Sequence, residues 1–121
     1  MPLILVVEDD EDNLELVTRF LQRQGYRVVR AADGVSGVKT AEECLPDLIL
    51  MDLGLPGLDG REAPRLIRAN PAPARIPIIA LTAHAMSEHV NRAVEVRMDA
   101  YETKPVKYER LMRKIATFVT A

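Results

Sequence analysis

Short apolar runs alternate with longer amphipathic stretches along the whole chain. The short runs predict strands at 3–7, 27–31, 48–52, 77–82 and 100–103. After each of them, apolar residues recur at helical spacing and predict helices at 11–24, 34–44, 60–69, 87–96 and 107–119. Strands that alternate with helices are typical of a parallel sheet covered by helices on both faces. We therefore expect an α/β fold built from five strand–helix units.

Residues at the junctions support these boundaries. Gly25 follows the first helix, where a residue in the left-handed conformation often ends a helix, and Pro46 stops the second. Near the end of the second helix, Cys44 is expected to be a small core or half-buried thiol. The last helix has one apolar face, which we expect in the core: Tyr108, Leu111, Met112, Ile115 and Val119.

Length and composition narrow the possible classes of protein. The 121 residues are long enough for one domain, expected to span 1–121, and 48% of them are hydrophobic. A formal net charge of −2 argues against a nucleic-acid surface. Cys44 is the single cysteine, so the chain can form no internal disulfide, and no apolar run is long enough to span a bilayer. These features indicate a cytoplasmic protein without a membrane anchor.

Reactive or charged residues follow four of the predicted strands. Glu8 and Asp9 follow the first, Asp52 ends the third, Thr82 ends the fourth, and Lys104 follows the fifth. In an open parallel sheet, ligands bind outside the carboxyl ends of the strands, so these residues are expected to converge at one edge. Carboxylates, a hydroxyl and a lysine gathered there are typical of a site for Mg²⁺ and a phosphoryl group.

The carboxylates also have a simpler interpretation as partners of a helix N-terminus, which suits Asp10 as well as Asp9. However, two like charges 4 Å apart cost about 4 kcal/mol at an effective dielectric constant of 20, so a cluster that includes Asp52 needs a cation. A carboxylate such as Asp52 can attack phosphorus, with Lys104 and Thr82 contacting the phosphoryl oxygens. Taken singly, Thr82 and Lys104 are ordinary strand and surface residues, and only their combination indicates a site.

Four segments carry a family resemblance: VVEDDEDN, DLILMDLGLPGLDG, PIIALTAHAM and DAYETKPV. In this order they closely resemble the receiver domain of two-component response regulators, of the stand-alone chemotaxis and cell-cycle type. The resemblance runs from residue 3 to about 119. It implies a flavodoxin-like, doubly wound (βα)5 fold with the strand order 2-1-3-4-5.

The resemblance also implies a role for each site residue. Asp52 would be the phosphoacceptor, and Mg²⁺ would be held by Asp9 directly, by Glu8 through water, by Asp52 and by the carbonyl group of Gly54. Lys104 would bind the phosphate. Thr82 and Tyr101 would be the switch residues that respond to phosphorylation.

The function implied is a phosphorylation-activated switch, and not an enzyme beyond self-catalysed phosphotransfer and slow autodephosphorylation. Its expected partners are a histidine kinase or histidine phosphotransfer protein and a downstream protein. The downstream protein would bind the face formed by the helix at 87–96, the strand at 100–103 and the helix at 107–119.

Three other classes of protein share part of this pattern but fit it less well. A haloacid-dehalogenase-like phosphatase has a second carboxylate two residues after its nucleophile, where this chain has Gly54. A flavin- or nucleotide-binding protein of flavodoxin type needs a glycine-rich loop after the first strand, where this chain has acids. A degenerate receiver that serves only as an interaction module is disfavoured by the intact set of site residues.

Overall fold

The computed structural model describes residues 1–52, 67, 69, 75–82, 100–103 and 107–119, with the backbone alone at 82 and 101–103. Its elements are, in chain order, β1 (Leu3–Val7), α1 (Glu11–Arg23), β2 (Arg27–Ala31), α2 (Gly34–Cys44), β3 (Leu48–Asp52), β4 (Ile78–Thr82), β5 (Ala100–Thr103) and α5 (Tyr108–Phe118). All of them begin and end within one residue of the bounds expected from the sequence. The helices expected at 60–69 and 87–96 lie outside the described residues, apart from residues 67 and 69.

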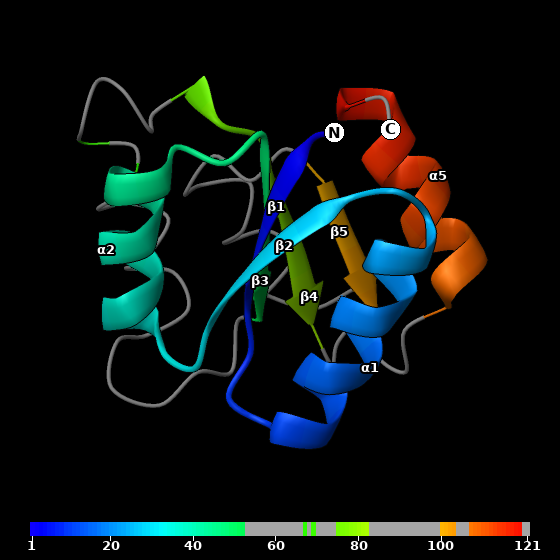
Figure 1. Ribbon diagram of the computed structural model, residues 1–121, viewed down its shortest axis with the longest axis horizontal. Coiled ribbons are helices and arrows are strands. Elements are labelled where there is room, and N and C mark those ends of the chain that lie inside the picture. The colour runs from blue at the N-terminus through cyan, green and yellow to red at the C-terminus, as the bar shows by residue number, and fades with distance from the viewer. Residues whose placement is uncertain (53–66, 68, 70–74, 83–99, 104–106, 120–121) are drawn as a thin grey trace.

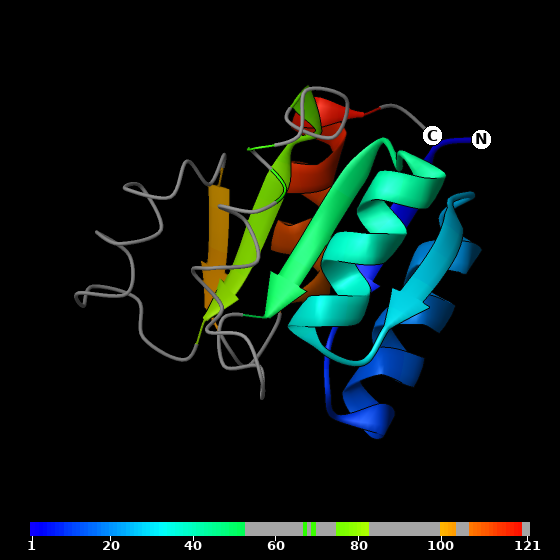
Figure 2. The same ribbon diagram turned by 90° about the vertical axis from the view of Figure 1, so that its left-hand side faces the viewer.

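The strands form one parallel sheet in the order β2-β1-β3-β4-β5, which confirms the doubly wound flavodoxin-like topology. Its registers align the carboxyl ends of the central strands: Val7 pairs with both Ala31 and Met51, and Asp52 pairs with Leu81. The strand arrowheads in Figure 2 accordingly point the same way. Residues that follow these strands therefore meet at one edge of the sheet.

Helices cover both faces of the sheet, with α1 and α5 on one face and α2 on the other (Figure 1). Alternate residues of β1 enter different cores: Leu5 and Val7 pack on the α2 face, and Ile4 and Val6 on the α1–α5 face. All residues of β3 are buried, as expected for a central parallel strand covered on both sides.

The apolar face expected on the last helix is confirmed. Leu111 and Ile115 of α5 are buried, and Tyr108, Met112 and Val119 pack against the same core. Helix α5 also contacts α1, because the ring of Tyr108 stacks on Phe20 with a centroid distance of 4.6 Å and an angle of 17°. Such an aromatic pair adds to the apolar burial that holds the two helices together.

Local interactions explain where the helices begin and end. The side chain of Asp10 caps α1 by accepting hydrogen bonds from the backbone N–H groups of Asp12 and Asn13, at 2.9 and 3.1 Å. Asp10 thus takes the helix-partner role that the sequence suggests. Gly25 has φ 92°, which confirms the left-handed residue expected after α1.

The end of α2 differs from expectation. Cys44 is exposed, so the prediction of a core or half-buried thiol is wrong. The buried face of α2 is formed by Gly34, Gly37 and Ala41. Cys44 is the last residue of the helix, one turn beyond Ala41, and is not covered by the core. Leu45 then adopts a left-handed conformation, φ 46° and ψ 63°, since the following Pro46 disfavours a further α-helical residue.

Candidate functional site

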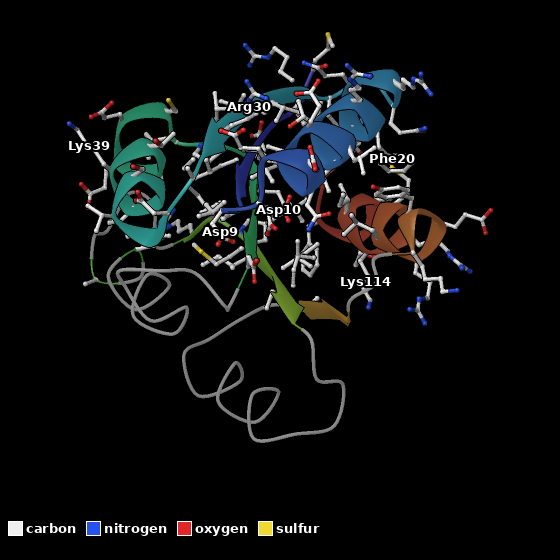
Figure 3. All side chains as sticks on the ribbon, turned by 90° about the horizontal axis from the view of Figure 1, so that it is seen from below. Asp9, Asp10, Phe20, Arg30, Lys39 and Lys114 are labelled. Carbon is white, nitrogen blue, oxygen red and sulfur yellow. The ribbon has the colours of Figure 1, made fainter. Side chains whose placement is uncertain are left out.

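Three carboxylates meet at the carboxyl edge of the sheet. Glu8 and Asp9 follow β1, and Asp52 is the last residue of the neighbouring strand β3. Each residue offers one oxygen atom, and these atoms all lie within 4.8 Å of one another. Figure 3 looks onto this edge, where Asp9 and the cap residue Asp10 are labelled. The convergence expected from the sequence is thus present for these three residues.

The three side chains differ in their contact with solvent. Glu8 and Asp52 are only 3% and 4% exposed, whereas Asp9 is exposed. Successive side chains of a strand point to opposite faces of the sheet. Glu8 continues the series Ile4 and Val6, and Asp52 the series Leu48 and Leu50, all of which face α1 and α5. The carboxylates of Glu8 and Asp52 therefore lie on the α1 side of the sheet edge. The cluster is therefore buried on one side and open to solvent on the other.

Backbone and side-chain contacts hold Glu8 in place. Its N–H group donates to the carbonyl oxygen of Ala31 at 3.0 Å, which ties it to the end of β2. Its Oε1 accepts a hydrogen bond from Asn13 Nδ2, in the first turn of α1, at 3.4 Å. The sequence did not single out Asn13, because a polar residue at the start of a helix is usually solvated. Its sequence signals are its place three residues after the cap residue Asp10 and its position at the end of the segment VVEDDEDN.

The donor chemistry of the cluster fits a magnesium ion. Mg²⁺ binds oxygen ligands, usually one or two carboxylates together with water, and the open side around Asp9 gives water access. Without a cation, three clustered carboxylates repel one another, and burial of Glu8 and Asp52 strengthens this repulsion by lowering the local dielectric constant. The positive end of the α1 dipole offsets only part of that charge.

The remaining expected site residues are placed only partly. Thr82 ends β4, the neighbour of β3, and its backbone pairs with Thr103; Tyr101 lies in β5. The two expected switch residues therefore lie on neighbouring strands, with Tyr101 paired with Ala80, two residues before Thr82. Their side chains lie outside what the structure describes. Gly54 and Lys104 also lie outside the described residues.

No helix among the described residues is long and apolar enough to cross a membrane.

Comparison with known proteins identifies the family. The family model described as the response regulator receiver domain matches residues 4–116. DivK, a polar-differentiation response regulator from Brucella anthropi, is 33% identical over 116 residues, which cover 96% of this chain and 94% of DivK. The sensor protein GacS from Pseudomonas syringae is 38% identical over 117 residues, but the aligned region is 13% of GacS.

Solved structures agree with these sequence matches. The receiver domain of the sensor histidine kinase PA1611 from Pseudomonas aeruginosa, which has a magnesium ion in its active-site cleft, is 41% identical with a TM-score of 0.91. The match covers 97% of this chain and 96% of that domain. The chemotaxis regulator CheY4 from Vibrio cholerae is 27% identical with a TM-score of 0.93, over 98% of this chain and 99% of CheY4.

The matched residues include all three carboxylates of the cluster. The chain belongs to the response regulator receiver domain family, whose members are phosphoacceptor switches of two-component signalling.

Proposed function

We propose that Asp52 is the residue of this receiver domain that accepts the phosphoryl group. The observation that carries the proposal is the position of Asp52 at the buried end of β3, within 4.8 Å of the carboxylates of Glu8 and Asp9. Among these three residues, Asp52 alone belongs to a strand that is buried throughout. A charged group is seldom placed at such a position without a function.

In the proposed reaction, a carboxylate oxygen of Asp52 attacks the phosphorus atom of a phosphohistidine. A new P–O bond forms, the P–N bond breaks, and its electron pair leaves with the imidazole nitrogen. The product is an acyl phosphate on Asp52. Because Gly54 stands where a phosphatase has its second carboxylate, the chain lacks that group for activating water, which favours a persistent signal.

Glu8, Asp9, Asp52 and the carbonyl group of Gly54 would hold the Mg²⁺ ion. Bound there, the cation would offset the negative charge of the carboxylates and of the incoming phosphoryl oxygens. Lys104, which follows β5 in the sequence, would add a second positive charge for the phosphoryl oxygens.

A receiver domain takes its phosphoryl group from a histidine kinase, and a histidine phosphotransfer protein can serve as the intermediate donor. The downstream signal would pass through Thr82 and Tyr101 to the face formed by residues 87–96, β5 and α5. Adjacent placement of the β4 and β5 ends supports this coupling.

Incubation with acetyl phosphate and Mg²⁺ tests the assignment of Asp52. Intact-mass spectrometry should show one added phosphoryl group on the wild type and none on Asp52→Asn, because an amide is a poor nucleophile. Asp47→Asn is the matched control, since Asp47 lies at the opposite end of β3 and should leave the labelling unchanged. Equal labelling of the wild type and Asp52→Asn would remove Asp52 from this role.

A further inference from the structure

The contact between Asn13 and Glu8 joins the first turn of α1 to the carboxylate cluster. Asn13 Nδ2 donates to Glu8 Oε1 at 3.4 Å. Glu8 is 3% exposed, so its carboxylate has little access to water as a source of hydrogen-bond donors. A neutral amide on the edge of the site supplies a donor without adding a charge that would compete with a cation.

Asn13 is itself held by the start of the helix. Its backbone N–H donates to Asp10 Oδ1 at 3.1 Å, as part of the cap of α1. Further along the same helix, Glu15 accepts a hydrogen bond from Arg30 of β2 at 3.2 Å, which ties this half of α1 to the sheet. The amide of Asn13 is therefore presented to Glu8 from a backbone that is fixed relative to β1 and β2.

We propose that Asn13 is a positioning residue for the divalent cation, and that it acts by fixing the orientation of the Glu8 carboxylate. The proposal rests on the proposed function, because it assigns Mg²⁺ to the cluster that contains Glu8. The two oxygens of a carboxylate are rigidly joined, so a donor on Oε1 also fixes the direction of the other oxygen. Partners of this kind orient metal-binding carboxylates and alter affinity without touching the ion.

Two features distinguish this role from a purely structural one. The cap of α1 is made by the side chain of Asp10 and the backbone of Asn13, so the side chain of Asn13 is not needed for it. Replacement of asparagine by alanine also improves helix propensity. Loss of the Asn13 amide should therefore weaken cation binding while leaving the cation-free fold intact.

The test measures Mg²⁺ affinity by isothermal titration calorimetry on the unphosphorylated protein, for the wild type and three variants. Asn13→Ala should bind Mg²⁺ about five-fold more weakly, somewhat less than the roughly 10- to 100-fold effects typical of such supporting residues, because the contact is long and only partly buried. Gln22→Ala removes an exposed amide elsewhere in α1 and should match the wild type. Asp9→Ala should lose most of the binding.

A second readout follows the side-chain NH₂ signals of Asn13 and Gln22 by NMR during the same Mg²⁺ titration. The Asn13 signals should shift with a midpoint equal to the calorimetric Kd, and the Gln22 signals should not move. Melting in EDTA, in which Asn13→Ala should melt no lower than the wild type because alanine has the higher helix propensity, separates cation binding from helix stability.

The outcomes distinguish failure of the Asn13 positioning role from failure of the Mg²⁺ site itself. If Asn13→Ala binds Mg²⁺ as tightly as the wild type, or if Gln22→Ala loses as much affinity, Asn13 is not a positioning residue. If Asp9→Ala also binds as the wild type does, the cluster is not the Mg²⁺ site and the proposed function fails with it.

Discussion

Helix α2 lies so close to β1 that a Cβ atom added at Gly37 would be 2.9 Å from Cγ2 of Val7. Both residues are buried, and Val7 directly precedes Glu8. The absence of a side chain at Gly37 therefore sets the depth at which α2 packs on the strand that leads into the carboxylate cluster. Valine is branched at Cβ and stiff, so it cannot move aside as a flexible side chain would.

Gly37→Ala should destabilise the protein by about 1–2 kcal/mol. The gain of about 1 kcal/mol in helix propensity is outweighed by the clash with Val7 in a closely packed core. Urea unfolding measures the change. The exposed neighbour Ser36→Ala is the control and should raise stability slightly, because it gains propensity without a clash.

A double variant tests the cause of that loss. Val7→Ala removes both methyl groups that the new Cβ would meet, so Gly37→Ala should cost less in the Val7→Ala background than in the wild type. Strictly additive losses would show that the clash with Val7 is not the reason.

A buried hydroxyl group within α1 has no hydrogen-bond partner among the residues that the structure describes. Thr18 is 7% exposed, and its Oγ1 makes no hydrogen bond to any residue that the structure describes. Thr18→Val replaces the hydroxyl by a methyl group of similar shape, so we expect stability to rise by about 1 kcal/mol. Urea unfolding checks it. Thr117→Val is the control: Thr117 Oγ1 is exposed and donates to the Arg113 carbonyl at 3.0 Å, so no gain is expected.

The sequence predicts the carboxylate cluster well because its geometry follows from topology. Parallel strands end at one edge, so any residues that follow β1 and end β3 must meet, and the apolar pattern suffices to place Glu8, Asp9 and Asp52 there. The contact of Asn13 with Glu8 and the close approach of Gly37 to Val7 depend instead on how each helix is rotated and how deeply it packs. Periodicity gives the buried face of a helix, but neither its depth nor its partners.

The end of α2 was mispredicted for a related reason. The apolar pattern places Cys44 on the same helical face as the buried Ala41, but burial also depends on what lies above that turn. The left-handed Leu45 could not be foreseen, since leucine rarely adopts a positive φ. The positive φ of Gly25, by contrast, could be predicted because glycine adopts such a conformation without strain.

Alkaline pH should reveal the burial of Tyr26. Burial raises the pKa of its hydroxyl above the ordinary value of 10.0. The unfolded chain therefore ionises first, and the stability contributed by neutral Tyr26 is complete below pH 10 and is lost as the pH rises toward the raised pKa.

Tyr26→Phe removes the ionisable hydroxyl. Between pH 10 and the raised pKa, the free energy of unfolding of the variant should therefore rise relative to that of the wild type by up to about 1.4 kcal/mol per pH unit. Urea unfolding at pH 7 and at several values above pH 10 measures the difference. Stability curves that stay parallel throughout this range would contradict the assignment.

Phosphorylation should be transmitted through Thr82. Its place at the end of β4, beside the end of β5, suits a hydroxyl that moves toward the phosphoryl group and draws the adjoining strand with it. In NMR spectra of the wild type, phosphorylation should shift signals across residues 87–103. In Thr82→Ala these shifts should shrink while phosphorylation itself still occurs, because a ligand acts only through its differential affinity for two states. Undiminished shifts in Thr82→Ala would exclude this coupling.

Magnesium alone should stabilise the fold, because folding brings Glu8, Asp9 and Asp52 together while the unfolded chain has no preformed site. A cation that binds only the native state adds about 2.7 kcal/mol at a hundredfold excess over Kd, which raises the melting temperature of a domain of this size by about 10 °C. Scanning calorimetry in EDTA and in millimolar Mg²⁺, with Na⁺ at matched ionic strength as the control, measures the increment. A melting temperature that responds to Na⁺ as much as to Mg²⁺ would exclude a specific metal site.

Asp9→Ala separates the repulsion among the carboxylates from the stabilisation that Mg²⁺ binding adds. The substitution removes one of three clustered negative charges, so the variant should melt above the wild type in EDTA, while its increment from Mg²⁺ shrinks because a ligand is lost. Asp12→Ala is the matched control. Asp12 is an exposed acid in the first turn of α1 that lies outside the cluster, and its charge favours the helix N-terminus. Asp12→Ala should therefore melt slightly below the wild type in EDTA and keep nearly the full Mg²⁺ increment. If both variants changed in the same direction in EDTA, net charge rather than the carboxylate cluster would be the cause.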